Sequence, residues 1–287
     1  DLQLPEEETG GAVMIRDITI GQYYPAQSPI HRLDPRVKIV CTLAFLISLF
    51  LQNSILGYVI AFLFLAGVIH FSKVPFKFIV KGLKPIMILL LFTVVMNLFL
   101  TRSGAVLFHY GIFTITEGGL RTCVFMTIRL MFLVAGSSIM TFTTTPNGLT
   151  DGIEKLLHPL NKIKVPVHEV AMMMSIALRF IPILLEETDK IMKAQVARGA
   201  DFESGNIIQR AKSMIPILVP LFVSAFRRAN DLAMAMEARC YRGGDGRTKM
   251  KPLKYKSQDR VAYLITLVYL IAIVGIGRFV PFKIWIF

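Results

Sequence analysis

The sequence predicts an all-α integral membrane protein with about five transmembrane helices and two further long, kinked helices outside the bilayer. The chain has 287 residues, of which 54% are hydrophobic and only 18% are charged. Several apolar runs approach the roughly 20 residues that a helix needs to cross a bilayer. Between residues 143 and 260, in contrast, apolar residues recur at helical spacing but alternate with many charges.

The chain begins with residues 1–13, DLQLPEEETGGAV, which are acidic and differ from everything that follows. We expect this stretch to be an artificial remnant or a disordered tail, with the rest of the chain starting at Met14. Nothing before Arg36 has an apolar core long enough for a cleavable signal peptide.

Five apolar runs are long enough to span a bilayer, and they lie at 37–53, 55–72, 85–100, 121–142 and 261–280. The first four belong to a region that we assign to residues 14–142. The last lies in a C-terminal region that we assign to residues 261–287.

Lys and Arg predict the orientation of these spans, because cytoplasmic loops are enriched in both. They gather at the start of the first span, between the second and third spans, and between 143 and 260. The loops at 52–54 and 101–120 hold few of them. We therefore expect a cytoplasmic N-terminus and an extracellular C-terminus.

The region 143–260 is too polar to be simply membrane-spanning and too helical in pattern to be a loop. Two long amphipathic helices are expected there, at 167–198 and 213–241. The prolines expected to bend them are Pro182, Pro216 and Pro220. The glycines expected to stop them are Gly199 after the first and Gly243 and Gly244 after the second.

Both long helices end at an Ala-Arg pair, in Ala197-Arg198-Gly199 and in Ala238-Arg239-Cys240. An Arg near a helix C-terminus is favoured by the helix dipole, by roughly 0.3–1 kcal/mol, and needs no partner. The repetition favours a second interpretation, because small neighbours leave each guanidinium unobstructed. Such an Arg suits a plug that enters an acidic groove of another protein and binds a carboxylate through two hydrogen bonds.

Other charged residues have structural interpretations. Asp34 and Arg36 are expected to form a local salt bridge and to cap the first span, with Pro35 as its first helical residue. Arg129 lies within a span, where an unpaired charge is costly, so we expect it to face the bundle interior or a carbonyl. A substrate role for Arg129 is the less favoured alternative. Arg179 is expected to contact a headgroup or another helix.

Several function classes are excluded because the sequence lacks their motifs. The chain contains no HExxH, no GxSxG and no Gly-rich phosphate loop, and its histidines show no ligand spacing, so no enzyme, cofactor or metal site is predicted. The net charge of +13 comes without a nucleic-acid-binding motif. The cysteines are odd in number and unclustered, which argues against disulfides.

Three features together resemble one family: SPIHRLDPRVK (28–38), LRFIP (178–182) and the two Ala-Arg-X triplets. They are similar to the transmembrane scaffold, or T component, of energy-coupling factor transporters, the EcfT family, and the resemblance covers nearly the whole chain from Met14. It implies a prokaryotic cell-membrane protein whose two cytoplasmic coupling helices dock into grooves of two ABC-type ATPase subunits. A third protein, the S component, would bind the vitamin or metal-ion substrate.

The resemblance also implies roles for particular residues. The ATPase-docking residues would be Ala197, Arg198, Gly199, Ala238, Arg239 and Cys240. Cys240 departs from the family pattern, in which Gly or Ala is more usual at that position. Flexible methionines on both long helices suit a surface that repacks against different S components, although lipid contact or core packing explains them equally well. These methionines are Met172, Met173, Met174, Met234 and Met236.

The sequence thus predicts a membrane scaffold that couples ATP hydrolysis in two partner subunits to movement of an S component. The alternative is a self-sufficient permease that binds its own solute between the spans. A permease should show polar residues converging at mid-membrane or Gly/Pro-broken spans arranged as repeats. Arg129 is the single such residue that stands out, so the scaffold is preferred.

Overall fold

The fold is known from a computed structural model. It describes residues 23–52, 54–100, 106–110, 113–202, 206–243, 250 and 252–279. Residues 1–13, predicted to be a remnant or tail, lie outside the described residues. The chain divides into two compact units. We call Gln22–Leu156 together with Lys251–Phe287 the bundle unit, and Leu157–Met250 the hairpin unit.

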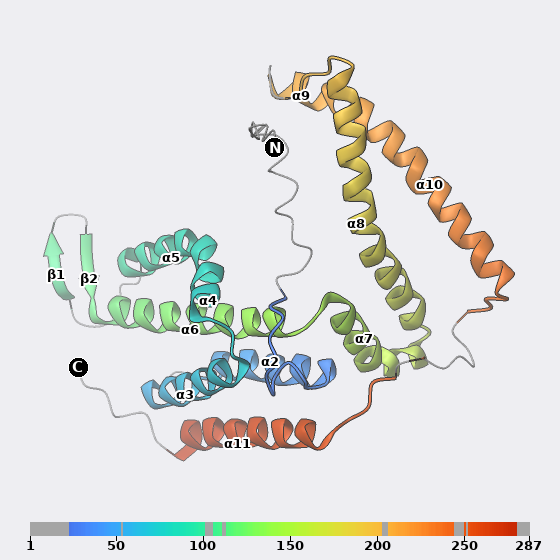
Figure 1. The fold of residues 1–287 in the computed structure, drawn as a ribbon. Coiled ribbons are helices and arrows are strands. Elements are labelled where there is room, and N and C mark those ends of the chain that lie inside the picture. Colours follow the sequence, from blue (N-terminus) through green and yellow to red (C-terminus); the bar gives the residue numbers. More distant parts are fainter. Residues whose placement is uncertain are drawn as a thin grey trace, which may run out of the picture. The chain divides into compact units, whose positions relative to one another are not determined.

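The bundle unit is almost entirely helical. Its helices are α2 (Pro35–Phe50), α3 (Ile55–Ser72), α4 (Phe76–Leu83), α5 (Met87–Leu100), α6 (Glu117–Thr143), α7 (Pro146–Leu157) and α11 (Ser257–Phe279), with the 3-10 turn η1 (Lys84–Ile86) before α5. Helix α6 contacts α2, α3, α4 and α5, and α11 packs on α2 and α3 (Figure 1). Helix α6 is therefore the central element of this unit.

A short β-hairpin separates α5 from α6. Strand β1 (Val106–Tyr110) pairs antiparallel with β2 (Phe113–Thr116), and Tyr110 lies opposite Phe113. The sequence predicts a loop at 101–120, whereas the structure has this hairpin there. Strands this short give only a few residues of alternation, which is too weak a signal to separate them from irregular chain.

The predicted class, an all-α membrane protein, is confirmed. Among the described residues, the helices long and apolar enough to cross a membrane are Ile55–Ser72, Phe76–Leu98, Glu117–Thr143, Val167–Ala197 and Ser257–Ile276. Four of them cover predicted spans. The first predicted span, 37–53, folds instead as α2, which has only 16 residues.

The remaining candidate span, Val167–Ala197, is the first of the two long helices that we expected outside the bilayer. Most of its apolar residues lie in its first half, and most of its charged residues follow from Glu186 onward. Length and composition alone therefore permit this helix to cross a membrane. The charge distribution instead favours a helix with one apolar end and one solvent-exposed end.

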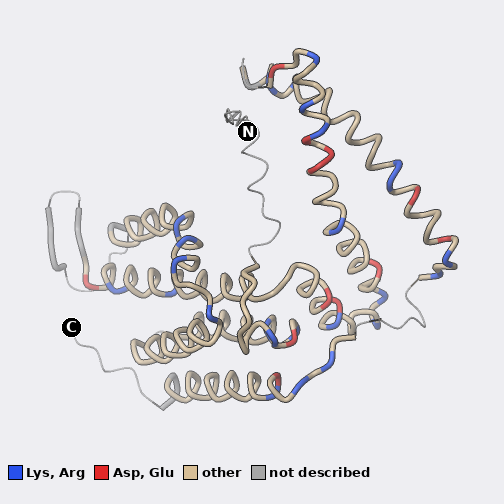
Figure 2. Tube along the Cα trace, in the orientation of Figure 1, with Lys and Arg blue, Asp and Glu red and all other residues tan. Residues whose placement is uncertain are grey.

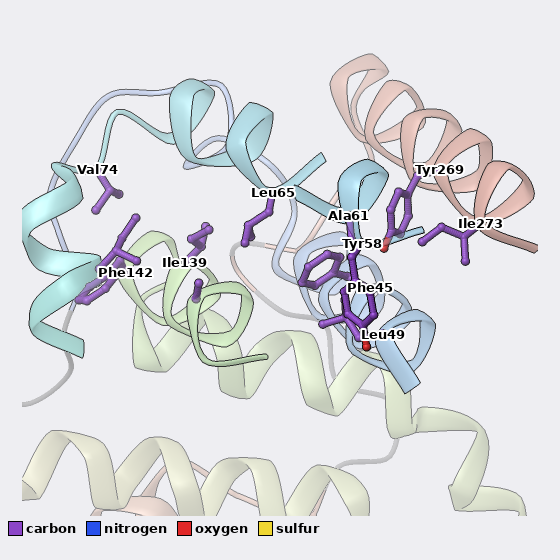
Figure 3. Close-up of a cluster of buried hydrophobic side chains, with 12 residues drawn as sticks. Phe45, Leu49, Tyr58, Ala61, Leu65, Val74, Ile139, Phe142, Tyr269 and Ile273 are labelled. Atoms are coloured by element: carbon purple, nitrogen blue, oxygen red, sulfur yellow. The ribbon is translucent and has the colours of Figure 1, made fainter. Parts of the chain in front are cut away.

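The core of the bundle unit is a cluster of aromatic and aliphatic side chains from α2, α3, α4, α6 and α11, together with Val74 (Figure 3). The rings of Phe64 and Tyr269 stack with their centroids 4.3 Å apart, and the ring centroids of Phe45 and Phe64 are 5.7 Å apart. A Cβ added at Gly136 would lie 2.7 Å from the Phe45 ring. Gly136 thus lets α6 approach α2, as small residues do between membrane helices.

The hairpin unit contains η2 (His158–Ile163), α8 (Val167–Ala197), α9 (Ile207–Ser213) and α10 (Ile215–Ala238). Helix α8 runs unbroken through Pro182, and α10 carries Pro216 in its first turn and Pro220 inside it. The bends expected at these prolines stay predictions. Among the described side chains of this unit, the buried apolar ones are Val167, Ala171 and Ile217.

Helices α8 and α10 are antiparallel and pack where α8 ends and α10 begins (Figure 1). The Gln195 side-chain amide donates to the Pro216 carbonyl at 3.4 Å. Glu187 accepts from the Ser224 hydroxyl and from the Arg228 guanidinium, the latter at 2.8 Å. These contacts hold the two long helices together at one end of the hairpin unit.

Candidate functional site

The first Ala-Arg triplet forms the end of α8. Ala197 is the last helical residue, Arg198 is the C-cap, and Gly199 follows with φ 86°. The Gly199 N–H donates to the Val196 carbonyl at 2.9 Å, and the Ala200 N–H donates to the Gln195 carbonyl at 3.0 Å. This pair of bonds is a Schellman motif, in which a left-handed residue satisfies the last carbonyls of the helix.

The second triplet forms the end of α10 with the same geometry. Arg239 is the C-cap, and Cys240 follows with φ 54°. The Cys240 N–H donates to the Glu237 carbonyl at 2.8 Å, and the Tyr241 N–H donates to the Met236 carbonyl at 3.0 Å. The two triplets therefore share one backbone structure and not only a sequence pattern. We call them the α8 tip (Ala197–Gly199) and the α10 tip (Ala238–Cys240).

This geometry corrects one prediction and explains another. Helix α10 ends at Arg239 and Cys240, so Gly243 and Gly244 do not stop it as predicted. Gly243 has φ 90° but lies beyond the cap, and Gly244 is outside the described residues. The third triplet position favours Gly because a left-handed backbone costs other residues roughly 1–2 kcal/mol. Cys240 bears that cost.

Both tips are exposed. All six triplet residues lie on the surface of the chain, and the side chains of Arg198 and Arg239 form no hydrogen bond or ion pair with another described residue. Each guanidinium lies beside the negative end of its own helix dipole, which holds it in place weakly. The planar N–H donors of both guanidinium groups are therefore available to a carboxylate that is not among the described residues.

The two tips lie at opposite ends of α10. The contact of Gln195 with Pro216 places the end of α8 beside the start of α10. Helix α10 has 24 residues, so at 1.5 Å per residue it is about 36 Å long. Figure 1 shows the two tips at the two ends of this helix. A single acidic pocket cannot bind both arginines at that separation.

Glu187, Ser224 and Arg228 form the polar contact that sequence reasoning missed. In the structure the Glu187 carboxylate bridges two residues of α10 that are 37 and 41 positions away. No short motif connects positions so distant, so the sequence carried no signal for it.

The methionines predicted as partner contacts fall into two groups. Met173, Met174 and Met234 are exposed, at 58%, 43% and 60%. Met172 and Met236 are half-buried. Packing within the chain accounts for the second group but not for the first.

The predicted cap of the first span is confirmed. The Asp34 carboxylate accepts from the Arg36 N–H at 2.9 Å and pairs with the Arg36 guanidinium at 2.8 Å, and Pro35 begins α2. Burial raises the pKa of Asp34, but the hydrogen bonds and charge of Arg36 outweigh burial and hold that pKa below its usual value. Asp34 and Arg36 are therefore structural residues.

Arg129 also has a structural role. Its Nε donates to the Tyr58 hydroxyl at 3.1 Å, and its other arm donates to the Gln52 carbonyl at 2.9 Å. The expected contact with a carbonyl is thus confirmed, and it ties α6 to the chain that joins α2 and α3. Arg179, in contrast, is exposed on α8.

Acidic, His and Cys side chains do not gather into a metal-binding group anywhere in the described residues. Cys41, Cys123 and Cys240 are free thiols.

Comparison with known proteins identifies the family. The model of the family described as cobalt transport protein, CbiQ, matches residues 26–250. A protein of Clostridium kluyveri named energy-coupling factor transporter transmembrane protein EcfT is 59% identical, over 89% of this chain and 95% of its own length. Proteins of the same name are 52% identical in Thermosediminibacter oceani (94% and 100% covered) and 49% identical in Bacillus subtilis (91% and 98% covered). The predicted resemblance is thereby confirmed, and the chain belongs to the CbiQ/EcfT family.

Proposed function

We propose that this chain is the transmembrane component of an energy-coupling factor transporter, and that its α8 and α10 tips each dock into one of two ATPase subunits. The names of the relatives support the first part. One observation carries the second part: two exposed arginines, presented by the same Schellman geometry, lie about one helix length apart. Such a pair suits two separate acidic grooves.

The mechanism is a lever. Closure of the ATPases on nucleotide would move the two grooves, and each groove would displace the helix end whose Arg it holds. The contacts of Glu187 and Gln195 join α8 to α10, so displacement of one tip acts on both helices. ATP hydrolysis belongs to the partner subunits in this scheme, and this chain supplies rigid attachment.

The exposed methionines would contact the S component. Replacing Met173, Met174 and Met234 by Leu preserves apolar area but reduces adaptability. Riboflavin uptake through one S component and biotin uptake through another should then fall to different extents. The half-buried Met172 and Met236 provide the matched control, because their replacement by Leu should affect both uptakes equally. Equal effects of the two sets would favour packing.

We propose that both tips lie in the cytoplasm. In the bundle unit, Lys and Arg gather where α2 and α11 begin and along α4 (Figure 2), as expected for a cytoplasmic side. Native Cys240 is exposed and serves as an inside reporter in a variant without Cys41 and Cys123. An impermeant maleimide added to whole cells should label Ser103→Cys but not Cys240. The reverse pattern would place the tips away from the ATPases.

The permease alternative is not favoured. Three polar side chains inside the bundle unit are bonded to its own chain: Arg129 and Gln52 to carbonyls, and Ser48 to the Tyr269 hydroxyl. A solute site would need converging groups that are available to a ligand.

The test of docking is the Arg198→Ala, Arg239→Ala double variant, co-expressed with the two ATPases and an S component. Loss of a charge-assisted contact that leaves a buried carboxylate unpaired costs about 2–5 kcal/mol. Each single variant should therefore weaken co-purification of the ATPases, and the double variant should weaken it more. Arg179→Ala on the exposed face of α8 is the matched control and should assemble normally. Normal assembly and uptake with the double variant would contradict the proposal.

A further inference from the structure

Both chain connections between the hairpin unit and the bundle unit meet the first turn of α2. One connection passes through α7, and the other is the segment that precedes α11 (Figure 1). The residues concerned come from three distant parts of the chain. We call them the α2 hub: Asp34, Pro35, Arg36, Gly152, Tyr255 and Asp259.

The first connection is held by close packing. Helix α7 leads directly into the hairpin unit at Leu157. A Cβ added at Gly152 would lie 3.1 Å from the Pro35 Cβ and 3.3 Å from the Pro35 carbonyl carbon. Helix α7 therefore packs closely on the first turn of α2 at this position, and a shift of α7 toward α2 would press on Pro35.

The second connection is held by charge and hydrogen bonds. The Arg36 guanidinium lies 3.9 Å from the centroid of the Tyr255 ring, just before α11. The Asp259 carboxylate, which is only 1% exposed, accepts from the Lys256 N–H at 2.6 Å and from the Asp34 N–H at 2.9 Å. One side chain of α11 thus fixes both its own first turn and the entrance to α2.

The α2 hub is joined to the centre of the bundle unit by Lys38. Its ammonium donates to the Thr143 carbonyl at 2.7 Å, at the end of α6, and to the His31 carbonyl at 3.1 Å. Helix α6 in turn contacts most of the helices of the unit. A displacement received at the first turn of α2 can therefore reach α6 and α11 through direct contacts.

We infer that the α2 hub transmits displacement of the hairpin unit to the helices of the bundle unit, with Tyr255 and Gly152 as its positioning residues. The inference rests on the proposed coupling function. Because the described ends of both connections contact one helical turn, in the proposed mechanism a displacement that reaches either of them acts on the same part of α2. Contiguous packed and hydrogen-bonded contacts are the means by which two sites influence each other at a distance.

The test separates coupling from assembly. Tyr255→Leu removes the ring beneath Arg36, and Gly152→Ala adds a methyl group that pushes α7 from Pro35. Tyr255 is 54% exposed, so the Leu variant should fold. Each variant is purified with both ATPases and a riboflavin-binding S component and reconstituted in vesicles. Complex yield and ATP hydrolysis should stay within about two-fold, while riboflavin uptake per ATP should fall about ten-fold.

Two controls make the result specific. Tyr255→Phe keeps the aromatic ring and should restore uptake per ATP. Tyr269→Phe breaks a buried hydrogen bond to Ser48 elsewhere in the bundle unit and should leave the ratio unchanged. The inference is overturned if riboflavin uptake per ATP is unchanged in both Tyr255→Leu and Gly152→Ala. It is also overturned if Tyr269→Phe lowers this uptake per ATP equally. Failure of the proposed docking would appear differently, as normal assembly of the Arg198, Arg239 double variant.

Discussion

The arginines of the two tips differ from the internally bonded arginines of the bundle unit. In the bundle unit, Arg36 and Arg129 are bonded to neighbouring groups of the same chain. In the hairpin unit, Arg198 and Arg239 lie exposed at helix ends, and their side chains are bonded to no other described residue. Charge that a fold satisfies internally contributes to structure, whereas charge held rigidly and left exposed is available to a partner. The surroundings, and not the residue type, distinguish the two roles.

Apolar side chains show the same contrast. The bundle unit has a continuous core of stacked rings from four helices. In the hairpin unit, α10 exposes a row that includes Val219, Phe222 and Phe226, at 58%, 64% and 64%. A row of this size on a single helix is typical of a surface that another protein or a lipid covers.

The strongest way to break the bundle unit is to overpack its closest helix contact. Gly136→Val would place side-chain atoms where the Phe45 ring now lies. We expect the free energy of unfolding to fall by about 3 kcal/mol or more. Thermal unfolding of the detergent-solubilised chain measures this change. Gly275→Val is the control, because a Cβ there meets no described atom within 4 Å; an equal loss in both would refute the packing account.

A smaller loss should follow from removal of the internal arginine. Arg129→Met leaves the Gln52 carbonyl and the Tyr58 hydroxyl without this donor. We expect destabilisation by about 1–3 kcal/mol, because unsatisfied buried polar groups are costly. Chemical unfolding measures it, with co-purification of the ATPases as a second readout. Weaker ATPase binding by an otherwise stable variant would show that Arg129 is not merely structural.

Exchanging the third residues of the two tips should change the stability of the two helix ends in opposite directions. Cys240→Gly relieves a left-handed Cys and should stabilise the end of α10 by about 1 kcal/mol, whereas Gly199→Cys should destabilise the end of α8 by a similar amount. Amide hydrogen exchange at residues 236–241 and 195–200 reports each helix end separately. Changes of the same sign at both ends would mean that the two tips are not equivalent.

The smallest effect concerns pH and the cap of α2. The pKa of Asp34 is lower in the folded chain than its usual value, so its ionised form stabilises the fold. That contribution is complete above the unfolded pKa of about 3.9 and is lost as the pH falls through the folded value. Asp34→Asn keeps a good N-cap and should cost about 0.5–1 kcal/mol at pH 7. Unfolding curves should show that the difference in free energy of unfolding between the unchanged chain and Asp34→Asn shrinks below about pH 4. A difference that grew there would contradict the stabilising role of the ionised Asp34.

Local features of this chain were predictable, and long-range ones were not. The cap at Asp34 and Arg36 spans three residues, and the apolar runs of α3, α6 and α11 are continuous, so pattern alone identified them. The bond of Asp259 to Asp34 joins residues 225 positions apart, and that of Glu187 to Ser224 joins residues 37 apart. Such pairs depend on how helices pack, which composition and periodicity do not determine. The left-handed backbone of Cys240 was missed because two glycines nearby offered a more familiar stop signal.

The central claim is that the two exposed arginines contact two ATPase subunits, and site-specific photo-crosslinking tests it most directly. A photoreactive residue replaces Arg198, Arg239 or, as a control in the bundle unit, Lys77, which is exposed on α4. Cells that co-express both ATPases are irradiated, and crosslinked partners are identified by mass spectrometry. We predict crosslinks to an ATPase from positions 198 and 239, to a different subunit from each, and none from position 77. Crosslinks from 198 and 239 to lipid or to this chain alone would contradict the account.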